Sequence, residues 1–226
     1  MMSLCVQDTI VLTKSIPLPP NGIICAHPKR VKKIADKFLK NTMIHTDYRG
    51  YQIYVGDYQD QRVFVANTGI GAPAAAFLIE ELIAFGAKRI IRVGSNDSNF
   101  NGYKLNLVQE TTVPLGLKKD YKLLDESVEV DQYLRLKITM KAHKLGIELI
   151  ETINEHIDGY YADFKNRTGS SDMETGALYL LGHHYQLKYA SILMSYPKHG
   201  ATDEKNLLQQ AYELENMAIK VALLSL

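Results

Sequence analysis

One arginine lies inside a run of residues that otherwise predicts a buried strand. In the stretch RIIRVGSNDSN, residues 89–99, two isoleucines and a valine supply the β-branched core of a strand, and small turn residues follow it. Arg92 places a guanidinium in these apolar surroundings, where a charge is costly unless it is paired. Its partner is either a core carboxylate, such as Glu81 or Glu110, or the anion of a ligand.

The elements around Arg92 predict where this charge lies. A strand over 23–26 leads through a turn into a helix over 30–40, and a helix over 74–87 leads into the strand over 88–95. A helix between two apolar strands is typical of a parallel crossover, and such sheets bind ligands beyond the carboxyl ends of their strands. Because Arg92 and Ser95 lie near one such end, we expect them at a ligand site.

The remaining segments continue the alternation of strands and helices. Strands over 51–58 and 61–69 predict a hairpin with its turn at 59–61. The position of 147–157 in the alternation favours a strand, although its composition also allows a helix. Further strands are expected over 106–116 and 189–196, and helices over 131–146, 170–186 and 203–226. The sequence thus predicts one α/β domain over residues 1–226, with a central mixed sheet flanked by helices.

Composition and charge restrict the classes of partner. The 226 residues carry a formal net charge of +1 with no long block of one sign, which argues against nucleic acid or an anionic membrane as the main partner. No segment is typical of a membrane-spanning helix, and the N-terminus is not typical of a signal peptide. The two cysteines, Cys5 and Cys25, are too few for a disulfide framework or a CxxC metal site. These features indicate a reduced, cytoplasmic protein.

Two separated motifs resemble the nucleoside phosphorylase family, which includes uridine phosphorylases and hexameric purine nucleoside phosphorylases. They are NTGIGAPAAAFLIEELIAFGAKRIIRVGS at 67–95 and SSDMETGALY at 170–179. The similarity covers nearly the whole chain and implies a single-domain three-layer α/β fold. It implies phosphate-dependent cleavage of the N-glycosidic bond of a purine nucleoside or uridine, giving free base and ribose 1-phosphate. It also implies a dimer-based homo-oligomer, as a hexamer, and no metal or organic cofactor, with inorganic phosphate as co-substrate.

The resemblance also assigns roles to individual residues. The positions that match phosphate-binding residues are Arg30, Arg92, Ser95, Gly71 with Gly69, and Arg49, which in the family reaches into the site of a neighbouring subunit. Met173 and Glu174 match the pair that holds the ribose, and Tyr160 falls where the family stacks an aromatic ring on the base. Guanidinium suits phosphate because its planar donors bind two oxygens at once. From the residues alone, Arg30 is also compatible with a solvated helix start, Glu174 with a carboxylate favoured by the helix dipole, and Tyr160 with simple packing.

Several positions depart from the family pattern. Ala26-His27 stands where the family usually has Gly-Asp, whose glycine lets the main chain approach phosphate. Asn96-Asp97 stands where it has a small pair, and a carboxylate this close to the phosphate site repels the anion. The stretch from Ser195 to Pro197 lacks the aspartate that purine enzymes use as a general acid, and Arg167 alone represents the pair with which uridine phosphorylases bind uracil.

These departures keep two alternatives open. One is an impaired family member that binds nucleoside or phosphate without efficient turnover. The other is a nucleosidase that uses water, against which the two phosphate-site arginines argue because a water nucleophile needs no pair of cations.

Overall fold

The computed structural model describes residues 9–12, 17–98, 100, 102–162, 169–197 and 204–226, so that Cys5 and Arg167 lie outside the described part. Its strands are β1 (Asn21–Cys25), β2 (Lys40–Tyr48), β3 (Tyr51–Tyr58), β4 (Gln61–Asn67), β5 (Arg89–Ser95), β6 (Lys104–Thr112), β7 (Ser127–Glu129), β8 (Ile150–His156), β9 (Ser170–Asp172) and β10 (Lys188–Ser195). Its helices are α1 (Pro28–Phe38), α2 (Ala72–Ala84), α3 (Leu115–Asp120), α4 (Gln132–Lys144), α5 (Thr175–His184) and α6 (Glu204–Ser225). Among them, no helix combines the length and apolar character needed to cross a membrane.

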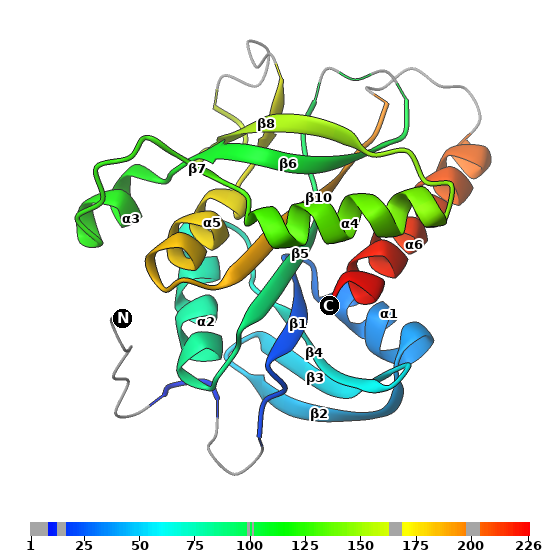
Figure 1. Cartoon of the computed structure of the whole chain (residues 1–226), viewed down its shortest axis with the longest axis horizontal. Helices are drawn as coiled ribbons and strands as arrows, with labels where there is room; N and C mark the ends of the chain where they lie inside the picture. Colours follow the sequence, from blue (N-terminus) through cyan, green and yellow to red (C-terminus); the bar gives the residue numbers. More distant parts are fainter. Residues whose placement is uncertain (1–8, 13–16, 99, 101, 163–168, 198–203) are drawn as a thin grey trace.

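All strands of the described residues join one mixed sheet in the order β2-β3-β4-β1-β5-β10-β6-β8-β9, with β7 paired to β6. Its centre is parallel, since β1 pairs with β4 and β5 and β5 pairs with β10. Figure 1 shows α2 and α5 to one side of β1 and β5, and α1 and α6 to the other. Helices on both faces explain why Ile23 and Ile24 of β1 and Ile90 and Ile91 of β5 are fully buried. The expected α/β fold with a central mixed sheet flanked by helices is confirmed.

The carboxyl ends of the parallel strands meet at one edge of this sheet. There β1 ends at Cys25, β4 at Asn67, β5 at Ser95 and β10 at Ser195. At this end of the sheet Ser95 closes β5, Gly69 and Gly71 follow β4, and Arg30 lies in the helix that follows β1, as expected for a sheet of this class.

Most of the predicted elements are present, with one wrong start and three omissions. The hairpin of β3 and β4 and the strand β8 are confirmed. The helix expected to begin at residue 170 begins at Thr175, because Ser170–Asp172 form β9 instead. The Asp172 carboxylate accepts the Thr175 N–H at 3.1 Å, so Asp172 precedes the helix and satisfies its first donors. The sequence interpretation missed β2, α3 and β7.

Candidate active site

Arg92 is almost fully buried, with 2% of its surface exposed, and two carboxylates hold it. Its Nη2 forms an ion pair with Asp172 Oδ2 at 2.8 Å and donates a hydrogen bond to Glu174 Oε2. Burial, the largest influence on the pKa of Arg92, disfavours the charged guanidinium, but the Asp172 and Glu174 carboxylates outweigh it and raise the pKa. Arg92 is therefore a permanent buried cation.

The carboxylates expected from the sequence are not its partners. Glu81 accepts the backbone N–H groups of Val11 and Leu12 at 2.8 to 3.1 Å, and Glu110 accepts the Ser127 hydroxyl. The specific pairing with Glu81 or Glu110 is therefore wrong. Arg92 does pair with carboxylates, and one of them is Glu174.

Part of the Arg92 guanidinium stays unsatisfied. Its Nε and Nη1 atoms are buried and have no hydrogen-bond partner among the described residues. Buried donors without partners are rare in folded proteins, and a ligand anion is one chemistry that satisfies them. The pairing with carboxylates and the binding of an anion are thus compatible in this structure.

A first cavity, which we call the basic cavity, opens over Arg92 and has a volume of about 710 Å³. Its lining includes Arg30, Ser95, Gly69 and Glu174. Arg30 Nη2 donates to Ser95 Oγ at 3.2 Å, and its Nε donates to Glu215 Oε1 at 2.7 Å. With 13% of its side chain exposed, Arg30 is not a solvated residue of the helix start. Arg30 and Arg92 place two cations on one cavity.

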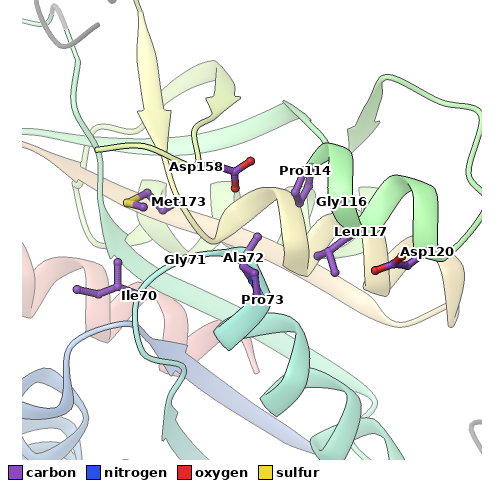
Figure 2. Close-up of a pocket in the computed structure, with 10 residues that line it drawn as sticks. All are labelled: Ile70, Gly71, Ala72, Pro73, Pro114, Gly116, Leu117, Asp120, Asp158 and Met173. Carbon is purple, nitrogen blue, oxygen red and sulfur yellow. The ribbon is translucent and has the colours of Figure 1, made fainter. Parts of the chain in front are cut away.

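A separate, neighbouring cavity has a volume of about 550 Å³. Figure 2 shows that neighbour, with the side chains of Ile70 and Met173 on one side and those of Pro114 and Leu117 on the other. Ile70 lines both spaces, whereas Arg92 lines only the basic cavity.

Glu215 of α6 fixes the position of Arg30. Its Oε2 accepts from Lys33 Nζ at 3.1 Å while its Oε1 accepts from Arg30, so one carboxylate holds two cations of α1. Burial is the largest influence on the pKa of Glu215 and raises it, but Arg30 and Lys33 outweigh burial and leave the pKa below its ordinary value. Glu215 is therefore ionised at neutral pH.

A second cavity of about 880 Å³, the aromatic cavity, adjoins the basic cavity. Both are lined by Ser95 and Glu174, and the aromatic cavity is also lined by Met173, Tyr160 and Tyr196. Tyr160 is 46% exposed. The structure thus brings Met173, Glu174 and Tyr160 to a space next to the two arginines.

Gly71 reaches this site through Glu174. Its N–H donates to Glu174 Oε1 at 2.8 Å, and its φ of 93° lies in the region that favours glycine. Gly71 lines the cavity of Figure 2, as does Met173, which also lines the aromatic cavity. Met173 therefore forms part of the wall between these two spaces.

Arg49 is not brought to the site within one chain. It is exposed in the turn between β2 and β3, where its guanidinium lies 5.5 Å from the ring centre of Tyr48. Its neighbour Gly50 does line the basic cavity.

Three positions that depart from the family pattern have structural partners here. His27 Nδ1 accepts the Lys29 N–H at 3.0 Å and caps α1. Asn96 donates to Ser170 Oγ at 2.7 Å and accepts from Ser195 Oγ at 3.0 Å. These contacts give the departures a role in holding the loops of the site.

The sequence interpretation missed Asp172 and Gly94. Asp172 precedes a helix, and a carboxylate at such a place is a recognisable capping signal. A Cβ at Gly94 would lie 1.3 Å from Arg92 Nη1, so the guanidinium occupies the space that this glycine leaves. Only the three-dimensional course of the arginine side chain reveals that requirement.

Comparison with known proteins agrees with this geometry. A family model described as the phosphorylase superfamily matches residues 20–96, which include Arg30, Gly71, Arg92 and Ser95. A purine nucleoside phosphorylase of the DeoD type from Exiguobacterium sibiricum is 27% identical over 212 residues, covering 87% of this chain and 88% of the relative. A uridine phosphorylase from Thermococcus kodakarensis is 29% identical over 185 residues, covering 71% of this chain and 66% of the relative.

Solved structures agree as well. A uridine phosphorylase from Vibrio fischeri superposes with a TM-score of 0.84 at 25% identity and covers 92% of each chain. The resemblance to the nucleoside phosphorylase family is confirmed. A purine nucleoside phosphorylase from Toxoplasma gondii, solved with immucillin-H, has a TM-score of 0.80 at 22% identity, covering 92% of this chain and 90% of the other, and shares the nucleoside phosphorylase fold.

Proposed function

We propose that the protein is a nucleoside phosphorylase that cleaves a purine nucleoside or uridine with inorganic phosphate as co-substrate. The observation that carries this proposal is the pair of unpartnered buried donors of Arg92, which lies with Arg30 on the basic cavity. Phosphorolysis needs an anion held next to a sugar, and Glu174 lies where the basic and aromatic cavities meet. The similarity to purine nucleoside and uridine phosphorylases supports the same reaction.

In this proposal, a phosphate oxygen attacks the anomeric carbon of the ribose. The new carbon–oxygen bond forms as the N-glycosidic bond breaks, and the electron pair of the broken bond leaves with the base. Arg92, Arg30 and Ser95 bind the phosphate, and fixed cations and hydroxyls of this kind reduce the barrier by positioning and electrostatic stabilisation. Neither a metal nor an organic cofactor takes part.

Glu174 and Met173 hold the ribose, and Tyr160 packs against the base. In the ligand-free structure Glu174 accepts from Arg92 and from the Gly71 N–H. Phosphate binds the free Nε and Nη1 donors of Arg92, so the contact of Nη2 with Glu174 stays in place. The Glu174 carboxylate uses its remaining lone pairs to accept from the ribose hydroxyls.

Arg49 serves the site of a neighbouring subunit in a dimer-based homo-oligomer, assembled as a hexamer. The exposed apolar side chains of Met43, Ile44 and Tyr48 on β2, next to Arg49, support this assembly because they leave an apolar surface at the edge of the sheet. The cytoplasmic location stays a prediction.

The test is a comparison of Arg30→Ala with Lys32→Ala, two variants of α1. Only Arg30 lines the basic cavity, whereas the Lys32 side chain is 62% exposed and pairs with Asp36. We expect Arg30→Ala to raise the KM for phosphate about 10- to 100-fold, the usual size of a lost charge-assisted hydrogen bond, and Lys32→Ala to leave it unchanged. Base release that does not depend on phosphate in either variant would contradict the proposal and favour a nucleosidase.

A further inference from the structure

Two polar side chains of the aromatic cavity have no partner for their terminal atoms. Asp97 Oδ2 and Ser171 Oγ are both buried and lack a hydrogen-bond partner among the described residues. Ser171 is only 3% exposed, and both residues line the aromatic cavity. A buried polar atom without a partner costs free energy, which a ligand that supplies the partner recovers.

The backbone holds these two side chains next to each other. The Asp97 N–H donates to the Ser171 carbonyl at 2.9 Å and the Ser171 N–H donates to the Asp97 carbonyl at 2.8 Å, in an antiparallel bridge. Residues opposite each other in such a pair project their side chains to the same face of the sheet, with Cβ atoms about 4.5–5.5 Å apart. The preceding residues are tied as well, since Asn96 Nδ2 donates to Ser170 Oγ at 2.7 Å.

The chemistry of the pair selects its ligand. An ionised carboxylate only accepts hydrogen bonds, and a serine hydroxyl is able to donate one. Side by side, they fit a molecular edge on which an N–H lies beside a carbonyl oxygen or a ring nitrogen. The hydrogen-bonding edges of uracil, of 6-oxopurines and of adenine all have this arrangement.

We propose that Asp97 and Ser171 bind the hydrogen-bonding edge of the base, with Asp97 accepting its N–H and Ser171 donating to the adjacent acceptor. The inference rests on the proposed function, because it takes a nucleoside as the ligand of the aromatic cavity. It assigns base recognition to the loop after β5 and to β9. The segment after β10, where the purine enzymes of the family carry their carboxylate, supplies Tyr196 and Pro197 instead.

The experiment measures binding by calorimetry for uridine, inosine, adenosine, ribose 1-phosphate and inorganic phosphate. We expect Asp97→Asn to weaken binding of the nucleoside that binds best about 10- to 100-fold, because a hydrogen bond to a charged group is lost. The differences in affinity among uridine, inosine and adenosine should also become smaller. Ser171→Ala weakens binding of the same nucleoside. Ribose 1-phosphate and phosphate bind unchanged, since they carry no base.

Ser98→Ala is the matched control for Ser171→Ala. Its hydroxyl is also buried without a partner among the described residues, but Ser98 does not line the aromatic cavity. Three results would overturn the inference. Asp97→Asn could weaken binding of ribose 1-phosphate as much as binding of the nucleoside, or it could leave nucleoside binding unchanged. The third result is that the wild-type protein binds no nucleoside. Nucleoside binding that depends on Asp97 in a protein without phosphate-dependent base release supports the inference and refutes the proposed reaction.

Discussion

A single glycine determines where the Arg92 guanidinium lies. The guanidinium extends over Gly94, within the distance at which any Cβ would collide with it, and meets Asp172 and Glu174 there. Because both carboxylates are also buried, the group cannot move away without leaving charges unpaired. The position of one cation therefore depends on the absence of one methyl group.

Gly94→Ala tests this dependence. We expect the variant to lose about 1–3 kcal/mol of unfolding free energy, as overpacked cores do, and to bind phosphate more weakly. Gly116→Ala is the control, since a Cβ there meets no atom within 4 Å. Chemical denaturation measures the unfolding free energy of each variant, and titration with phosphate measures its affinity. A Gly94→Ala variant that matches the wild type in both would contradict this dependence.

Glu174→Gln separates the two tasks of this carboxylate. Removing its charge leaves Arg92 more strongly attractive to anions, so phosphate binds more tightly, whereas turnover of nucleoside falls because the ribose loses a charged acceptor. Calorimetry with phosphate and steady-state kinetics measure the two effects. Weaker phosphate binding in Glu174→Gln would show that the Glu174 charge does not reduce the attraction of Arg92 for anions.

At the level of elements, Glu215 joins α6 to α1 beneath the basic cavity. It pairs with Arg30 and Lys33 and has a pKa below its ordinary value. A group whose pKa is lowered by folding contributes stability above its unfolded pKa, and that stability is lost as the pH falls through the folded value. The contact between these two helices is therefore sensitive to acid.

We expect the unfolding free energy of Glu215→Gln to fall less steeply than that of the wild type when the pH is lowered from neutrality to below the ordinary glutamate pKa of 4.5. Denaturant titrations across this range measure the slope. Glu213→Gln, an exposed position on the same helix, serves as the control and should follow the wild type. Identical slopes for all three proteins would exclude the contribution of Glu215.

The elements also show what the sequence predicts and what it does not. Apolar runs such as Ile90 and Ile91 identify the central strands, because burial on both faces leaves a continuous hydrophobic signal. The strand β2 was missed since its burial pattern has no alternation. The family resemblance predicted which residues gather around Arg92. It did not predict the pairing of Arg92 with Asp172, because that pairing depends on two segments that are distant in the sequence and no local pattern indicates it.

For the whole molecule, the proposal requires a second chain to complete the site. Arg49 is exposed on its own chain and lies beside the apolar edge formed by Met43, Ile44 and Tyr48. If Arg49 serves a neighbouring subunit, a site takes Arg92 from one chain and Arg49 from another.

Mixing two inactive variants tests this exchange. We expect Arg49→Ala and Arg92→Lys each to lose phosphorolysis, and a mixture refolded together to regain part of it, because hybrid dimers contain one site with both arginines. Activity of the mixture is compared with that of each variant alone. A mixture no more active than its components would place Arg49 outside the neighbouring site.

The most direct measurement of the central claim is base release by the wild-type protein from uridine, inosine and adenosine, each with and without inorganic phosphate. The account predicts release of base from at least one nucleoside only when phosphate is present, with ribose 1-phosphate formed in equal amount. Release without phosphate, or no release from any of the three, would contradict it.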